Sequence, residues 1–86
     1  MKPIEVHYNN RNDIHNYTGP AIIWENGDCE WYVNGRQHRL MGPAVECANG
    51  NKFFYIEGKA YSEDAYWKIM YEYGLITKQE AFLHLL

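Results

Sequence analysis

A set of landmarks that returns every 23 residues constrains the fold of this chain more than any other feature. The landmarks are a Gly-Pro-Ala triplet, an Asn-Gly pair and an aromatic-Tyr-aliphatic triplet. Their two copies are Gly19-Pro20-Ala21 and Gly42-Pro43-Ala44, Asn26-Gly27 and Asn49-Gly50, and Trp31-Tyr32-Val33 and Phe54-Tyr55-Ile56. A fixed period is typical of repeat proteins, in which each structural unit packs on its neighbours, so we expect one such unit per period.

Each unit is predicted to consist of short strands joined by tight turns. Asn-Gly is the strongest two-residue hairpin signal, because both central residues of a type I′ turn need positive φ. The chain holds about two and a half units: a partial one over 4–18, a full one over 19–41 and a shortened one over 42–61. The expected strands span residues 4–8, 14–16, 20–25, 28–33, 36–39, 44–47, 52–56 and 59–61.

A two-residue turn at Asn26-Gly27 would place Trp24 opposite Cys29, and this register divides the sheet into two faces. The more polar face carries aromatic side chains beside acidic ones. Such a surface suits a protein partner that presents Arg or Lys. The residues predicted to bind that partner are Ile23, Glu25, Glu30, Tyr32, Glu46, Phe53 and Tyr55. The alternative is that these side chains form a second small core.

The same repeat predicts a ladder of facing rings, one pair per unit. The pairs are Tyr8 with His15, Trp31 with His38, and Phe54 with Tyr61. Stacking needs only an exposed π-face, so this ladder is a candidate site for a nucleobase or another small flat ligand. Facing rings on a repeat sheet are more often core residues, and that reading stays open.

After Tyr61 the hydrophobic period changes from that of a strand to that of a helix. Ser62 is a predicted N-cap, and the apolar stripe Tyr66, Ile69, Met70 and Tyr73 predicts a helix that ends before Gly74. Thr77 and Glu80 form a capping box for a second short helix. That helix is expected to bury Ala81, Phe82 and Leu85.

The two helices are expected to close the sheet, because a repeat array needs a terminal lid. The predicted fold is therefore α+β, a meandering antiparallel sheet over residues 1–61 capped by helices in 62–86, within a single domain. The terminal residues Leu83, Leu85 and Leu86 indicate a further contact surface. A homodimer through these helices, or through the open edge of the sheet, follows as a prediction.

Composition excludes several classes of protein. Of 86 residues 47% are hydrophobic, which argues against a disordered tail. The net charge is −3 and no run of Lys or Arg occurs, so we expect no nucleic-acid partner. No apolar stretch approaches the length of a membrane span, so no membrane contact is expected. Two cysteines in so short a chain favour a reducing compartment, and the predicted location is the cytoplasm.

The unit resembles the MORN repeat, in a divergent form known from bacteria and phages that reads approximately Asn-Gly-x-x-His-Arg-x-x-Gly-Pro-Ala. Here the motif runs from Asn34-Gly35 through His38-Arg39 to Gly42-Pro43-Ala44, and a weaker copy occupies residues 11–21. Thr18 and Met41 stand where the family often has an acid. The resemblance implies a protein-contact platform without catalytic residues. It also implies a phage or mobile-element origin, and some bacterial members look like antitoxins.

The residues themselves give little support for catalysis or metal binding. The four histidines and two cysteines show no spacing typical of a metal site, and every glycine is explained by a turn, a landmark or a helix end. Whether Cys29 and Cys47 form a disulfide is left open. We therefore expect no enzyme, no cofactor and no metal.

The predicted function is that of a small interaction protein that binds a host protein, such as a defence component, and inhibits or redirects it. A small-ligand sink that uses the ring ladder is one alternative. An antitoxin-like or scaffold protein, whose partner would be a toxin, is another.

Overall fold

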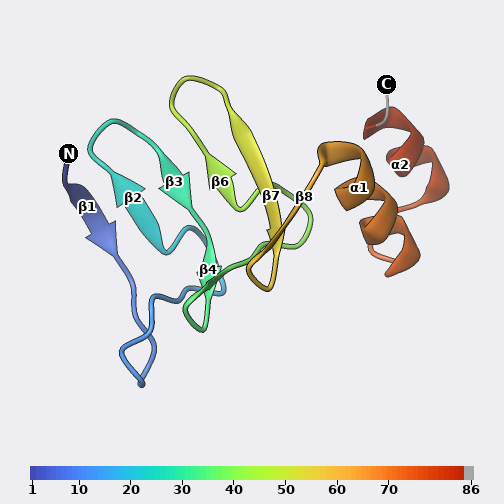
Figure 1. The fold of residues 1–86 in the computed structure, drawn as a ribbon. Helices are drawn as coiled ribbons and strands as arrows, with labels where there is room; N and C mark the ends of the chain where they lie inside the picture. The colour runs from blue at the N-terminus through green and yellow to red at the C-terminus, as the bar shows by residue number, and fades with distance from the viewer. Residues whose placement is uncertain (85–86) are drawn as a thin grey trace.

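The structure is a computed structural model that describes residues 1–84. It contains an open antiparallel sheet of six strands, a separate two-stranded hairpin and two C-terminal helices, which confirms the α+β prediction (Figure 1). The sheet follows the order β1-β2-β3-β6-β7-β8, and β4 pairs with β5. The strands are β1 (Pro3–Val6), β2 (Ile22–Trp24), β3 (Cys29–Glu30), β4 (Tyr32–Val33), β5 (Arg36–Gln37), β6 (Val45–Glu46), β7 (Lys52–Ile56) and β8 (Lys59–Tyr61).

Most predicted strands exist, but several are shorter than expected. The predicted strands over 52–56 and 59–61 match β7 and β8 at both ends. The predicted strand over 28–33 is interrupted at Trp31, where the chain passes from the main sheet into the β4–β5 hairpin. The predicted strand over 14–16 is reduced to one bridge between Tyr8 and Ile14.

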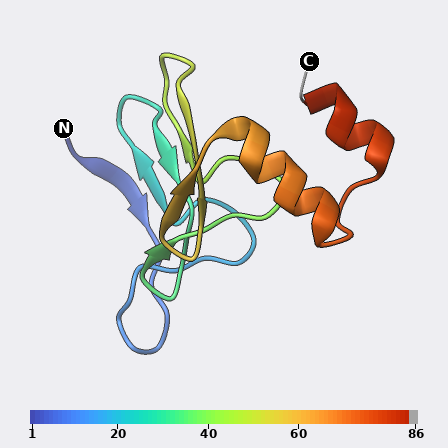
Figure 2. The same cartoon turned by 45° about the vertical axis from the view of Figure 1, so that its right-hand side comes forward.

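The hairpins point alternately to opposite ends of the molecule, as Figure 1 shows. At one end lie the turns that follow β2 and β6. At the other end lie residues 9–13 and the turns that follow β4 and β7. The hairpins thus follow one another side by side from β1 at one end of the sheet to the helices at the other (Figures 1 and 2).

The two kinds of Asn-Gly turn differ, and this corrects the predicted register. Asn34 and Gly35 both have positive φ, 51° and 81°, as a two-residue type I′ turn requires. At Asn26-Gly27 only the glycine has positive φ. There the Trp24 N–H donates to the Asp28 C=O at 2.9 Å. The loop there contains three residues, and the Asn49-Gly50 loop repeats it. The predicted pair of Trp24 with Cys29 is therefore wrong, and Ile23 faces Cys29 instead.

The 23-residue period is visible in the hydrogen bonds. The Nδ1 atom of His15 accepts the Asn34 N–H at 2.9 Å, and Nδ1 of His38 accepts the Glu57 N–H at the same distance. Asn34 and Glu57 are both first residues of left-handed turns, with φ of 51° and 49°. Each histidine therefore holds the turn of the following hairpin, one unit further along the chain.

The partial first unit departs from the period by one residue. His15 N–H donates to His7 C=O, just as His38 N–H donates to Trp31 C=O. His7, not Tyr8, therefore occupies the place of Trp31 in the first unit. The reason is the loop over residues 9–13, which is longer than the two-residue turns that follow β4 and β7.

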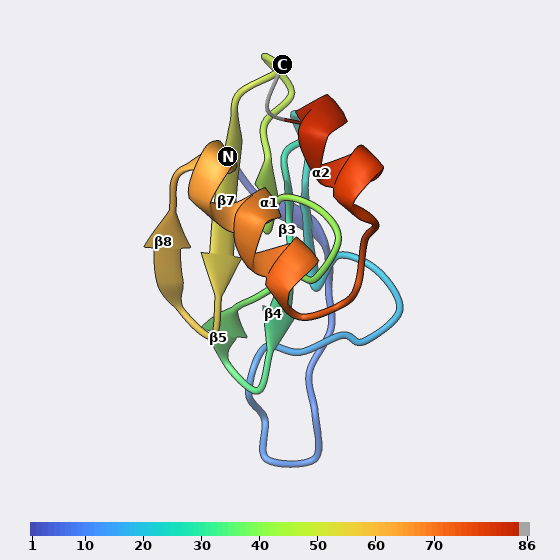
Figure 3. The same ribbon diagram turned by 90° about the vertical axis from the view of Figure 1, so that its right-hand side faces the viewer.

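Two helices close the sheet at its C-terminal end (Figure 3). The helix α1 (Glu63–Glu72) begins at Ser62, whose Oγ accepts the Ala65 N–H, and Gly74 follows its C-cap with φ of 75°. The helix α2 (Lys78–His84) begins with the predicted capping box, in which Thr77 and Glu80 exchange two hydrogen bonds of 3.1 Å. Both predicted caps are confirmed.

The hydrophobic core lies between α1 and the face of β7 that carries Phe54 and Ile56. Its members are Phe54, Ile56, Tyr66, Trp67, Met70, Ile76 and Ala81. The predicted stripe on α1 is partly wrong, because Trp67 is buried and Tyr73 is 59% exposed. Phe82 is 62% exposed rather than buried, since α2 packs through its neighbour Ala81 and through His84, which stacks on Trp67 at 3.6 Å. Leu85 and Leu86 lie outside the described residues.

Candidate functional site

A carboxylate surrounded by aromatic rings lies on the face of the sheet opposite α1. Glu30 in β3 accepts three hydrogen bonds: from Trp24 Nε1 at 2.6 Å, from Tyr32 Oη at 3.1 Å and from Gln37 Nε2 at 3.1 Å. These donors come from β2, β4 and β5. Glu30 therefore joins the main sheet to the small hairpin.

Strand register places further side chains on the same face. Glu30 lies opposite Val45, and Val45 lies opposite Phe53 in β7. Tyr55 follows Phe53 by two residues, so the alternation of a strand puts it on this side as well. Phe53 is 48% exposed, and Tyr55 is half-buried. We refer to this surface as the Glu30 face, formed by Trp24, Glu30, Tyr32, Gln37, Phe53 and Tyr55.

The charge of Glu30 affects its neighbours. Burial raises the pKa of Tyr32 to about 12, and the nearby negative charge of Glu30 is the next cause. Within residues 1–84 the only ion pairs are His7 with Glu5 and Arg39 with Glu46, so no cation within the described chain neutralises Glu30. The Glu30 face thus combines apolar rings with an unneutralised carboxylate. That combination fits an ammonium or guanidinium group.

The structure brings together four of the seven residues predicted to bind a partner: Glu30, Tyr32, Phe53 and Tyr55. Ile23 and Glu46 lie on the opposite face, because Cys29 pairs with both of them. Glu25 lies in the three-residue loop. The physical reason is the register: one extra loop residue reverses the faces of β2 and β6 relative to their partners.

Trp24 and Gln37 belong to the Glu30 face but were not predicted from the sequence. The place of Trp24 follows from the loop length, because a three-residue loop at Asn26-Gly27 puts Trp24 and Glu30 on the same side of the sheet. Gln37 lies opposite Tyr32 in the β4–β5 hairpin. The Asn34-Gly35 turn alone would have given that pair.

The predicted ring ladder forms only in part. Phe54 lies opposite Tyr61, and the backbones of Trp31 and His38 are hydrogen bonded, as expected. Tyr8 lies opposite Ile14 rather than His15. Phe54 is 5% exposed beneath α1, so it offers no surface to a flat ligand. The guanidinium of Arg39 lies 3.9 Å from the centre of the Trp31 ring and covers it. The geometry therefore leaves no continuous stacking site.

The two cysteines are not joined by a disulfide. Both thiols are free, and the pairing of Cys29 with Glu46 puts Cys47 on the other face. Burial, followed by the charges of Glu46 and Asp28, raises the pKa of Cys29, so the unreactive thiol form is favoured. In the part of the chain that the structure describes, no three metal-ligating side chains gather at one place.

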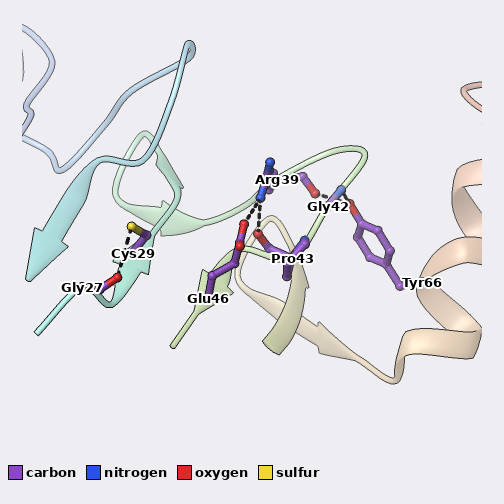
Figure 4. A network of polar contacts seen from close by, with 7 residues as sticks. All are labelled: Gly27, Cys29, Arg39, Gly42, Pro43, Glu46 and Tyr66. Carbon is purple, nitrogen blue, oxygen red and sulfur yellow. Dashed lines mark hydrogen bonds and ion pairs between the residues drawn. The ribbon is translucent and has the colours of Figure 1, made fainter. Parts of the chain in front are cut away.

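Arg39 organises the opposite face of the sheet. Its Nη1 atom donates to Glu46 Oε1 at 2.6 Å and to the Pro43 C=O at 3.1 Å (Figure 4). The Tyr66 hydroxyl of α1 donates to the Arg39 C=O at 2.6 Å and accepts the Gly42 N–H at 3.1 Å. The Gly-Pro-Ala landmark is therefore where the helix attaches to the sheet.

Across residues 1–84, neither helix has the length and apolar character needed to cross a membrane. Comparison with protein-family models, with curated proteins and with solved structures finds no match.

Proposed function

We propose that this chain is a non-enzymatic protein-binding module and that the Glu30 face is its binding surface. The observation that carries the proposal is the Glu30 carboxylate, held by three donors among aromatic rings and paired with no cation of the described chain. Aromatic side chains that keep a polar group are enriched at protein interfaces. The partner would present Arg or Lys to this face.

Fixed geometry favours binding at this surface. Trp24, Tyr32 and Gln37 are each held by a hydrogen bond to Glu30, so they lose little rotamer freedom when a partner docks. An arriving guanidinium would meet ring faces and a carboxylate that needs no rearrangement. Each of the three donors is a neutral group, so none of them supplies a positive charge to the carboxylate.

The nature of the partner is proposed from the resemblance to the bacterial and phage repeat. On that basis it is a protein of a bacterial host, met in the cytoplasm and inhibited or redirected by the chain. A toxin, neutralised by an antitoxin-like chain, is the alternative. The exposed side chains Phe82 and Leu83 on α2 support a second contact surface, which in a homodimer would meet another copy.

The test is a pull-down from bacterial lysate with the full chain and two double variants as baits. Tyr32→Ala with Tyr55→Ala removes two rings of the Glu30 face. Tyr71→Ala with Tyr73→Ala removes two exposed rings at the C-terminal end of α1 and is the matched control. We expect the native chain and the control to retain one stoichiometric protein, and the Glu30-face variant to lose it.

Circular dichroism and thermal melting must show that the variants fold. Should Tyr32→Ala with Tyr55→Ala unfold, Phe53→Asp replaces it, because Phe53 is half exposed and a change there preserves the core. Retention of the partner by a folded Glu30-face variant would refute the proposal. So would the absence of any stoichiometric partner in the native pull-down.

A further inference from the structure

The repeat places two equivalent grooves on the α1 side of the sheet, and α1 fills only one of them. The filled groove, here the second groove, has Phe54 and Ile56 as its floor and the Gly42-Pro43 loop as its rim. Tyr66 of α1 occupies it, with ring centres of Tyr66 and Phe54 4.7 Å apart. Tyr66 is fully buried there, and its hydroxyl bridges the Gly42 N–H and the Arg39 C=O.

The first groove lies one unit, or 23 residues, earlier. Trp31 and Val33 replace Phe54 and Ile56, and the loop of Asn16 to Pro20 forms the rim. This groove is open, with a volume of about 700 Å³. Its lining includes Asn16, Thr18, Gly19, Trp31, Arg39 and Leu40.

Hydrogen bonds show that the two rims are built alike. The Asn16 side chain donates to the Pro20 C=O at 3.1 Å, and the Arg39 side chain donates to the Pro43 C=O at 3.1 Å. The Asn16 N–H donates to Tyr32 C=O, just as the Arg39 N–H donates to Tyr55 C=O. Each pair of contacts is offset by 23 residues.

In the first groove, two backbone groups have no protein partner within residues 1–84, and they are the equivalents of the two that Tyr66 binds in the second. Those groups are the Gly19 N–H and the Asn16 C=O, for which no hydrogen bond is found within residues 1–84. They are the repeat equivalents of the Gly42 N–H and the Arg39 C=O. A donor and an acceptor beside an apolar floor select a ligand that ends in a hydroxyl, and tyrosine is such a group.

The grooves differ in two respects that bear on the ligand. Met41 has φ of 66°, whereas Thr18, its equivalent, does not have positive φ. Thr18 must therefore adopt positive φ if the rim of the first groove is to match the rim of the second groove, which Tyr66 occupies. In addition, the Arg39 guanidinium lies 3.9 Å from the centre of the Trp31 ring, so an entering ring must either displace it or stack on the guanidinium itself.

We propose that the first groove binds a helix of a partner protein that presents a tyrosine, with apolar residues one and four positions later. This is the spacing of Tyr66, Trp67 and Met70, all buried in the core cluster with Phe54 and Ile56. The tyrosine hydroxyl accepts the Gly19 N–H and donates to the Asn16 C=O. The site lies on the face opposite Glu30, so it stands or fails independently of the proposed function.

A peptide with the sequence of residues 62–74 serves as the probe, titrated into the isotopically labelled full chain and followed by NMR. We expect saturable binding that shifts the Gly19 amide and the Trp31 indole resonances and leaves the Gly42 amide unchanged. A peptide with Phe in place of Tyr66 should bind about tenfold more weakly, because it loses both hydrogen bonds of the hydroxyl.

Three variants of the full chain sharpen the test. Thr18→Asn should bind the peptide severalfold more tightly, because asparagine adopts positive φ more readily than a β-branched residue. Leu40→Asp places a charge in the lining of the first groove and should abolish binding. Ile4→Asp is the matched control, since Ile4 is exposed in β1 and outside the groove, and it should bind like the native chain.

Several results would overturn the proposal. One is no saturable binding at millimolar peptide, by the native chain and by Thr18→Asn alike. Another is a shift of the Gly42 amide instead of Gly19, which would mean that the peptide only displaces α1. Equal affinities of the Tyr and Phe peptides would also refute it, as would a concentration-dependent dimer that excludes the peptide, because the occupant would then be a second copy.

Discussion

At the residue scale, His15 and His38 show that a sequence repeat identifies equivalent residues but not the contacts they make. The equivalence of His15 and His38 is readable in the sequence, but their role is not. Each ring nitrogen accepts a backbone N–H 19 positions later in the chain, at a left-handed turn. Sequence spacing gives no indication of such a contact, because the partner group belongs to the backbone and is the same in every residue type.

His38→Phe tests this role, since it keeps a ring and removes the acceptor. We expect the free energy of unfolding to fall by about 1 kcal/mol, the net value of one hydrogen bond at a partly exposed site. Hydrogen exchange should become faster at the Glu57 amide and remain unchanged at Asn34. Unaltered protection of Glu57 in the folded variant would contradict the assigned contact.

The phenol of Tyr32 reports on the Glu30 face. Its pKa is raised to about 12 by burial and by Glu30, so folding is favoured while the phenol keeps its proton. The contribution is complete below the ordinary tyrosine pKa of about 10 and is lost as the pH rises through about 12. Unfolding experiments in this interval should show a decrease in stability that is smaller in Tyr32→Phe.

Glu30→Gln separates the two causes of that shift. The amide removes the charge but preserves the shape, so an ultraviolet titration should give Tyr32 a pKa below about 12 yet above about 10. It stays raised because burial, the larger cause, is unchanged. A Tyr32 titration that is the same in both proteins would show that the carboxylate has no influence on this face.

At the element scale, turn chemistry decided which predictions succeeded. An Asn-Gly pair fits a two-residue type I′ turn, and it equally fits the last two positions of a three-residue loop whose glycine is left-handed. Asn34-Gly35 adopts the first and Asn26-Gly27 the second. The dipeptide does not distinguish them, and the difference of one residue reverses a strand's faces. Strands and caps were therefore predictable, whereas the membership of the Glu30 face was predictable only in part.

Glu57 offers a way to stabilise one of these turns. It occupies the first position of a two-residue turn with φ of 49°, where Asn34 stands in the preceding unit. Asparagine tolerates this conformation better than glutamate, so Glu57→Asn should raise the free energy of unfolding by about 0.5–1 kcal/mol. Urea denaturation measures the gain. Asn34→Glu, the reverse change one unit earlier, should lower stability by a similar amount, and equal stabilities in both variants would contradict the argument.

At the scale of the whole molecule, apolar packing is concentrated at one end. The core cluster joins β7, α1 and α2. Toward the N-terminus, the buried hydrophobic residues are Ala21 and Ile22, and the mostly exposed strand β1 lies next to them at the edge of the sheet. In a stack where each unit contacts only its neighbours, stability approximates a sum of local terms. The helix end is expected to be the most stable part and the β1 end the first to open.

Met70→Ala tests this gradient, because Met70 is fully buried at the centre of the cluster. Loss of its side chain should cost about 2–5 kcal/mol, which is a large share of the stability of so short a domain. Native-state hydrogen exchange then distinguishes two outcomes. With local opening, amides of β7 and α1 lose protection by that amount, while those of β1 and β2 change little because they already open without the helix end. An equal loss of protection at every amide would instead show that the hairpins unfold only as one cooperative unit, and it would exclude an independent opening at the β1 end.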